Sequence, residues 1–191
     1  VNNLENTKTK RLSTKSMVLC AMFTALVAVG AFIQIPVPYM DYFTLQFFFV
    51  LLAGLILGAD KGAISVGCYV LLGLVGVPIF AAGGGIGYIF RPSFGYLVGF
   101  IVSAYVTGKV CEKLKASYKN YLLACLAGFV VTYAIGIVYK FIILNFYAHT
   151  PATLGVIFLS CFPLDMPGDF VLCLLAAGVG LRMRKSGFYL S

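Results

Sequence analysis

The stretch GLVGVPIFAAGGGIGYIFRPSFGY, residues 73–96, places a glycine-rich break and one arginine between two long apolar segments. Its glycines allow sharp bends and close backbone approach to a ligand, because glycine has no Cβ to clash. The stretch lacks the lysine and the serine or threonine that end a phosphate-binding loop, so it indicates no nucleotide site. We interpret it as a break between two membrane spans that is shaped for a ligand; an ordinary flexible loop is the alternative.

The composition on either side of this stretch is that of an integral membrane protein. Of the 191 residues, 61% are hydrophobic and only 10% are charged, and the mean hydropathy is +1.00, which excludes an ordinary soluble domain. A membrane helix needs about 20 mainly apolar residues. Six apolar runs approach that length, at residues 17–35, 43–59, 62–82, 92–108, 121–148 and 168–181.

These runs lack the strict alternation of a barrel strand, so we predict helices. The predicted fold is all-α: a polytopic membrane protein with six transmembrane helices and both termini in the cytoplasm. We divide it into a basic N-terminal segment (1–16), a membrane domain (17–185) and a short tail (186–191). Residues 150–162 are apolar but too short to span, which predicts an interfacial or re-entrant helix.

The net charge of +8 follows from membrane orientation, without nucleic acid as a partner. Twelve of the 14 basic residues fall in the N-terminal segment, in alternate breaks between the runs and after the last run. This distribution obeys the positive-inside rule. The first run is too long for a signal-peptide core and has no small-residue cleavage site, so we predict a retained helix. We therefore expect a multi-pass protein of the plasma membrane, embedded in the lipid bilayer.

Two basic residues, Arg91 and Lys140, break this pattern because they fall on the outer side. The outer half also holds Asp41, Asp165 and Asp169. Charged groups at membrane depth are costly unless they are paired or line a watered cavity, so they indicate a functional site. The alternatives are an interfacial Arg91 that binds lipid phosphate or Asp41, and a Lys140 whose ammonium snorkels to the headgroups.

Asp169 follows Pro167 and Gly168 in a turn that is predicted to start the last helix. A first-turn aspartate is stabilised by the helix dipole without any ligand. The same carboxylate can instead accept two N–H groups of a ligand. At the outer end of the second run, Gln46 can both donate and accept hydrogen bonds inside a cavity.

Enzymatic chemistry finds no support in the sequence. It contains no Ser/His/Asp set, no H-E-x-x-H, no paired acidic run and no Walker motif. The six cysteines show no C-x-x-C spacing, so we expect neither a metal site nor a cofactor. In the first run, Ala21, Ala25 and Ala28 would let another helix approach closely, either within the protein or from a partner subunit.

Several short blocks carry a resemblance to a known family: TLQ (44–46), LAG (52–54), GLVGVPIF (73–80), GGG (83–85), PSFGY (92–96) and PGD (167–169). In this order and spacing they resemble the BioY family, the biotin-specific substrate-binding (S) components of energy-coupling-factor (ECF) transporters, over about residues 15–185. The resemblance implies six membrane helices and an outer biotin pocket built around Gln46, Gly83, Gly84 and Asp169. It also implies that the first helix docks onto a transmembrane coupling subunit joined to two cytoplasmic ATPases.

The sequence departs from the family pattern at three positions. Members usually carry a lysine three residues after Pro-Gly-Asp, where this chain has Leu172. They usually have glycine before Pro-Ser, where it has Arg91, and some have an arginine after Gly-Tyr, where it has Leu97. We hypothesise that Arg91 and Lys140 supply the missing positive charge.

The chemistry of biotin matches these residues, since its carboxylate needs a cation, its ureido N–H groups need an acceptor such as Asp169, and its thiophane ring needs apolar walls. The alternatives are an S component for thiamine or riboflavin, although Arg91 and Lys140 would repel cationic thiamine, and a small membrane enzyme acting on lipid. Predicted biotin-binding residues are Gln46, Gly83, Gly84, Arg91, Tyr96, Lys140 and Asp169, and predicted wall residues are Phe43, Phe80, Tyr88 and Asp165.

Overall fold

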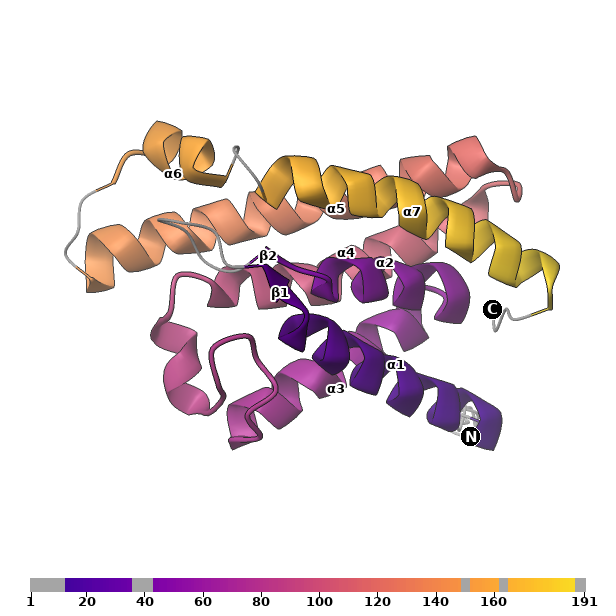
Figure 1. The fold of residues 1–191 in the computed structure, drawn as a ribbon, viewed down its shortest axis with the longest axis horizontal. Helices are drawn as coiled ribbons and strands as arrows, with labels where there is room; N and C mark the ends of the chain where they lie inside the picture. Colours follow the sequence, from indigo (N-terminus) through magenta and orange to yellow (C-terminus); the bar gives the residue numbers. More distant parts are fainter. Residues whose placement is uncertain (1–12, 36–42, 149–151, 162–164, 188–191) are drawn as a thin grey trace, which may run out of the picture.

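The computed structural model describes residues 13–35, 43–148, 152–161 and 165–187 as a bundle of helices (Figure 1). The seven α-helices are α1 (Thr14–Phe32), α2 (Gln46–Leu57), α3 (Ala59–Val75), α4 (Phe94–Lys113), α5 (Tyr118–Ile142), α6 (Leu154–Cys161) and α7 (Asp165–Lys185). A 3-10 helix, η1 (Ile86–Phe90), precedes α4, and one π-helical turn, η2 (Ile143–Tyr147), extends α5. Two short strands, β1 (Gln34–Ile35) and β2 (Phe43–Thr44), join α1 to α2.

Six of these helices occupy the six predicted apolar runs, and four of them are long and apolar enough to cross a membrane within the described residues. These four are Thr14–Phe32, Phe94–Lys113, Asp165–Lys185 and the continuous helix Tyr118–Tyr147 formed by α5 and η2. A helical membrane protein is therefore confirmed. The count of six spans depends on α2 and α3, which fall below this length.

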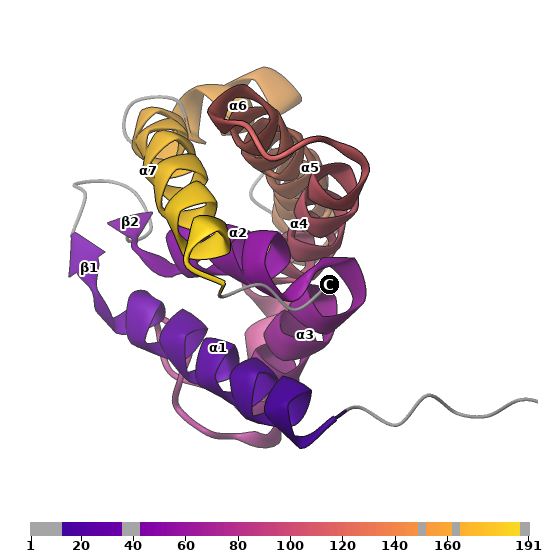
Figure 2. The ribbon, with the colours of Figure 1, turned by 90° about the vertical axis from the view of Figure 1, so that its right-hand side faces the viewer.

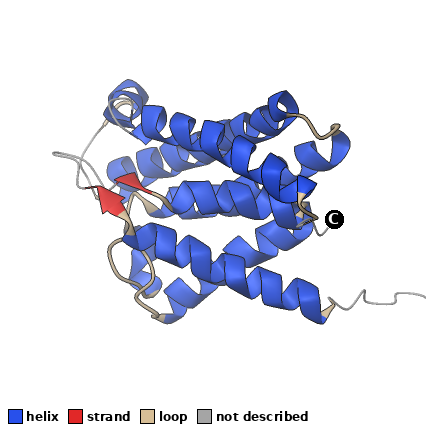
Figure 3. Cartoon of the chain, turned by 45° about the vertical axis from the view of Figure 1, so that its right-hand side comes forward, coloured by secondary structure: helices blue, strands red, loops and turns tan. Residues whose placement is uncertain are grey.

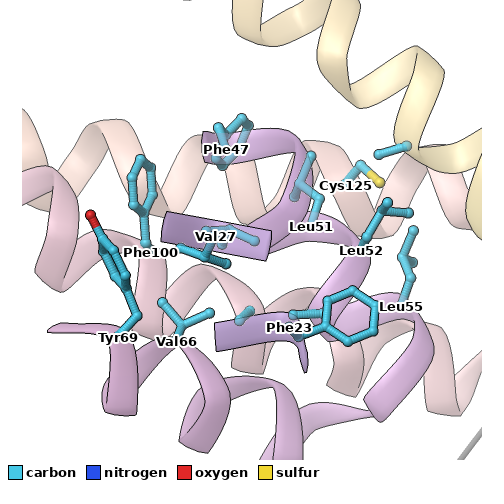
Figure 4. Packing of buried hydrophobic residues seen from close by; sticks show 14 of the residues in the cluster. Phe23, Val27, Phe47, Leu51, Leu52, Leu55, Val66, Tyr69, Phe100 and Cys125 are labelled. Atoms are coloured by element: carbon cyan, nitrogen blue, oxygen red, sulfur yellow. The ribbon is translucent and has the colours of Figure 1, made fainter. Parts of the chain in front are cut away.

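The central helix of the bundle is α2. Ten of its twelve residues are buried, and it packs against α1, α3, α4 and α7 (Figure 3). Figure 4 shows the core that results, in which Phe47 and Leu51 of α2 lie among side chains of its neighbours. At 1.5 Å per residue α2 is only about 18 Å long, less than the bilayer core. Because other helices enclose it, its length does not have to match the lipid.

Two glycines allow α4 to lie directly against α2 and its connection to α3. A Cβ added to Gly108 would lie 2.4 Å from the backbone nitrogen of Ala59, and one added to Gly54 would lie 2.5 Å from the carbonyl oxygen of Ala104. Both distances are shorter than any van der Waals contact. The glycines are therefore needed for this backbone approach, as at other close-packed membrane helix pairs.

The start of α1 and the end of α7 lie at the same end of the bundle (Figure 1). The connections α2–α3 and α4–α5 return to that end, which faces the viewer in Figure 2. The β1–β2 hairpin, the η1 loop and α6 lie at the opposite end. This arrangement agrees with the predicted separation of the basic connections from the glycine-rich stretch.

The helix boundaries differ from the predicted runs at the end that carries the loop. The third run was expected to continue to residue 82, but α3 ends at Val75 because Gly76 turns the chain with a left-handed φ of 115°. Sequence hydropathy alone did not predict the two strands, in which Gln34 lies opposite Thr44. These two-residue strands are a local departure from the predicted all-α fold.

Candidate functional site

A cavity of about 160 Å³ lies at the end of the bundle that holds the hairpin, above the first residues of α2. Four α-helices, strand β2 and the stretch of residues 81–93 contribute to it, so no single segment forms the site. Its lining consists of Phe43, Thr44, Gln46, Phe47, Ala81, Ala82, Tyr88, Arg91, Ser93, Tyr96, Leu97, Phe100, Tyr133, Lys140, Asp165 and Asp169.

The floor of the cavity is formed by the N-terminus of α2. Gln46 is the first residue of this helix and is only 3% exposed. Its Nε2 is buried and has no hydrogen-bond partner among the described residues. A buried donor without a partner is costly, typically about 1–3 kcal/mol. The Gln46 amide is therefore a group that a polar ligand in the cavity could satisfy.

The glycine-rich loop is held in shape by its own backbone. The amide of Gly85 donates to the carbonyl of Gly73 at 2.7 Å, and the amides of Phe80 and Gly83 each donate to the other residue's carbonyl at 2.9 and 3.1 Å. Tyr69 of α3 adds a hydrogen bond from its hydroxyl to the carbonyl of Ile79 at 3.1 Å. The loop is thus an ordered wall of the site.

Three residues predicted from this loop do not line the cavity. Phe80 is 1% exposed and lies behind the wall, with its ring 4.6 Å from that of Tyr88. Gly84 packs inward, because a Cβ there would lie 2.4 Å from the carbonyl oxygen of Val77. Gly83 adopts a φ of 110°, which favours glycine. In the place of these residues, Ala81 and Ala82 face the cavity.

Four of the five predicted outer charges line the cavity: Arg91, Lys140, Asp165 and Asp169. The fifth, Asp41, lies outside the described residues. The guanidinium carbon of Arg91 is 5.3 Å from the centre of the Tyr88 ring, within the range of a cation–π contact. Two cations and two carboxylates thus share one small space.

The prediction that Asp169 lies in the first turn of the last helix is wrong. α7 begins at Asp165, so Asp165 is the first-turn carboxylate and Asp169 lies one turn further along. The hydroxyl of Tyr133 on α5 donates to Oδ2 of Asp169 at 2.8 Å. Helix capping therefore does not account for Asp169.

Aromatic rings form the remaining walls and are seated on glycines. A Cβ on Gly136 would lie 2.5 Å from the Tyr96 ring, and a Cβ on Gly168 would lie 2.4 Å from the Phe43 ring. The Tyr96 and Tyr133 rings meet edge to face at a centroid distance of 5.8 Å. Tight packing of this kind fixes where each ring borders the cavity.

Sequence reasoning did not predict half of the lining residues. Tyr133 was detectable in principle, since it lies seven residues before Lys140 and thus on the same helix face. Phe100 similarly lies one turn after Tyr96. The residues not predicted are Thr44, Phe47, Ala81, Ala82, Ser93, Leu97, Phe100 and Tyr133.

The alanines predicted to dock a partner lie on the outward face of α1. Ala21 and Ala25 are exposed and Ala28 is half-buried. Large apolar side chains flank them on the same helix, including Met22, which is 41% exposed. Packing within the described part of the chain therefore does not explain Ala21 and Ala25.

A model of the BioY family matches residues 5–187, nearly the whole chain. The chain belongs to the BioY family. Among its relatives is the "Probable biotin transporter BioY" of Lysinibacillus sphaericus, 40% identical over 92% of this chain and 90% of that protein. Another is the "Biotin transporter BioY" of Thermotoga maritima, 38% identical over 90% of this chain and 96% of that protein.

A solved structure supports the BioY fold. The crystal structure of the S-component for biotin from an ECF-type ABC transporter superposes with a TM-score of 0.70 and covers 92% of this chain and 95% of that one. The two sequences are 23% identical, so this likeness concerns the fold. At the position where many BioY proteins are expected to carry a lysine, Leu172 is 5% exposed and belongs to the core.

Proposed function

We propose that this chain binds biotin with high affinity in the outer cavity and takes part in its uptake as the substrate-specific membrane subunit of an ATP-driven ECF transporter. Membership of the BioY family and the names of its relatives support this function. The observation that carries it here is the convergence of Arg91, Lys140, Asp169 and Gln46 on one cavity. These groups match the carboxylate and the ureido group of biotin.

The two ends of the ligand meet different residues. Arg91 or Lys140 binds the valerate carboxylate, since a charge-assisted hydrogen bond is about twice as strong as a neutral one. Asp169 accepts a ureido N–H, and the Gln46 amide donates to an acceptor of the ligand. The rings of Phe43, Tyr88 and Tyr96 enclose the bicyclic part, while Gly83 and Gly84 keep the loop in its shape.

Lys140 compensates for the residue that the family usually places at position 172. A leucine that is buried in the core and does not line the cavity occupies that position, whereas Lys140 of α5 lines the cavity. A cation that moves to a neighbouring helix preserves the charge needed at the carboxylate.

The membrane arrangement has six spans, α1 to α5 and α7, with both termini in the cytoplasm of a cell whose plasma membrane holds the protein. α2 crosses within the bundle, where neighbouring helices shield it, and α3 crosses with apolar side chains such as Leu71 and Val75 exposed. The basic residues at the ends of α4 and α7 support a cytoplasmic position for that end. The cavity then opens toward the outside.

Energy for uptake comes from partners, because the sequence has no nucleotide-binding motif. A transmembrane coupling subunit docks on Ala21, Ala25 and Ala28 of α1, and it joins two cytoplasmic ATPases to the complex. The chain itself then performs no covalent chemistry. Reconstitution with and without these partners tests whether uptake requires them.

Calorimetry on the purified protein tests the ligand and the residues together. We expect the wild type to bind biotin, with neither thiamine nor riboflavin competing, and to retain biotin detectable by native mass spectrometry. Asp169→Asn and Arg91→Ala should each weaken binding. Unchanged affinity in both variants would refute the residue assignment, and binding of another vitamin in preference to biotin would refute the function.

A further inference from the structure

A tyrosine outside the predicted site binds Asp169, the carboxylate that the proposed function assigns to the ligand. Tyr133 of α5 is 5% exposed and lines the cavity beside Asp169 of α7. Its hydroxyl donates to Oδ2 of Asp169 at 2.8 Å. An ionised carboxylate can accept several hydrogen bonds through two oxygens, so Oδ1 is left for a second donor.

The Tyr133 ring is itself held in place. It lies edge to face against Tyr96 at an interplanar angle of 77° and tilted against Phe129 at a centroid distance of 4.7 Å. Tyr96 is tied to a further element, since its hydroxyl oxygen is 3.0 Å from Sγ of Cys161 on α6. Tyr133 therefore offers its hydroxyl from a fixed position.

Without such a partner, the orientation of an aspartate carboxylate would be less well defined. The terminal torsion of Asp has a broad energy minimum, so burial alone does not select one carboxylate orientation. The phenol donor selects one by binding a single oxygen. It also compensates part of the desolvation of a carboxylate that lies close to a second one, Asp165, on the same wall.

We propose that Tyr133 is a positioning residue for ligand recognition: it fixes the Asp169 carboxylate through Oδ2 so that Oδ1 accepts a ureido-type N–H of the ligand. This inference rests on the proposed function, because it concerns the same cavity. It adds a residue that orients the acceptor for one ureido-type N–H of the ligand.

Tyr133→Phe tests the proposal, since it removes one hydroxyl and keeps the packed ring. We expect biotin affinity measured by calorimetry to fall about tenfold, as for the loss of a hydrogen bond to a charged group. The matched control is Tyr118→Phe, because the Tyr118 hydroxyl also joins α5 to α7, by donating to the carbonyl of Leu174 at 3.4 Å. That variant should bind biotin as the wild type does.

A double-mutant cycle separates positioning from general loosening of the site. In an Asp169→Asn background, Tyr133→Phe should cause little further loss, because there is no carboxylate left to orient. A biotin methylated on the ureido nitrogen that donates to Asp169 cannot make this hydrogen bond. Its affinity should therefore fall less on Tyr133→Phe than that of biotin does. Size-exclusion profiles and thermal unfolding in detergent, compared with Tyr118→Phe, establish that both variants are folded.

Wild-type affinity in Tyr133→Phe would overturn the proposal, and so would equal losses in the presence and absence of the Asp169 carboxylate. If Tyr133→Phe does not fold, Tyr133→Met, which also removes the hydroxyl, takes its place in the same cycle with Asp169→Asn. Wild-type biotin affinity in that variant would overturn the proposal. Failure of the wild type to bind biotin would instead refute the proposed function.

Discussion

At the scale of single residues, the site combines charges of both signs on a small number of positions. Arg91 comes from the loop before α4 and Lys140 from α5, and both line the cavity together with Asp165 and Asp169. The tyrosine ring under the Arg91 guanidinium already stabilises that cation. Lys140, for which the described residues show no such ring contact, is therefore the more informative position to change.

Lys140→Met should weaken biotin binding about tenfold or more, because it removes a charged donor but keeps the apolar stem. The methyl ester of biotin lacks the negative charge, so its affinity should change much less. Calorimetry with both ligands makes the comparison. An equal loss for the acid and the ester would contradict a role of Lys140 at the carboxylate.

At the scale of elements, the short helix α6 has one buried side and one exposed apolar side. Its eight residues are too few to span a bilayer. Ile157 is 2% exposed, whereas Val156 and Leu159 are 60% and 66% exposed. One side therefore packs on the bundle and the other presents apolar groups, as expected of an interfacial helix.

A tryptophan at Phe158 should report this position, because the natural chain contains no Trp. In vesicles, we expect lipids brominated near the headgroup to quench Phe158→Trp strongly. Val130→Trp on α5, where the side chain is 63% exposed, is a control for a position deep in the bilayer. Tyr118→Trp, at the first residue of α5, is a control for the opposite end. Quenching of Phe158→Trp no greater than that of Val130→Trp would place α6 away from the headgroups.

The contact between α4 and the α2–α3 connection predicts a stability effect. Gly108→Ala should destabilise the protein by about 1–3 kcal/mol, because the new methyl overlaps the Ala59 backbone, which cannot move alone. Gly67→Ala is the matched control on α3, where a Cβ meets no atom within 4 Å and helix propensity gains up to about 1 kcal/mol. Thermal unfolding in detergent measures both. Equal melting temperatures would contradict the close approach.

At the scale of the whole molecule, the proposed ligand site and the proposed docking surface lie on different parts of the bundle. The cavity lies at the end that holds the hairpin, whereas Ala21 and Ala25 lie on the outward face of α1. Small exposed side chains leave room for a helix of another subunit. The two activities should therefore respond separately to mutation.

Ala25→Trp should abolish biotin uptake that depends on the coupling subunit and leave biotin affinity of the isolated chain unchanged. The large ring would keep the partner helix at a distance without touching the cavity. Val130→Trp places the same ring on the exposed face of α5 and should preserve both activities. Transport in proteoliposomes and calorimetry measure the two. Normal uptake by Ala25→Trp would exclude this face of α1 as the docking surface.

The sequence by itself determined the membrane class, the positions of the helices and the side on which the unusual charges gather. These properties follow from local composition: apolar runs of about 20 residues, basic breaks between them, and charges where lipid would otherwise lie. The motifs also sufficed to recognise the family. Arg91, Lys140 and Asp169 were found in this way, because a charge at membrane depth is conspicuous in any context.

Only the tertiary structure decided which residues border the cavity and which support it. Phe80, Gly83 and Gly84 belong to the right loop, yet hydrogen bonds and close backbone packing turn Ala81 and Ala82 to the cavity in their place. Tyr133 resembles any other aromatic residue of a membrane helix until α7 places Asp169 within 2.8 Å of its hydroxyl. Such contacts join segments distant in sequence, so hydropathy and local motifs do not contain them.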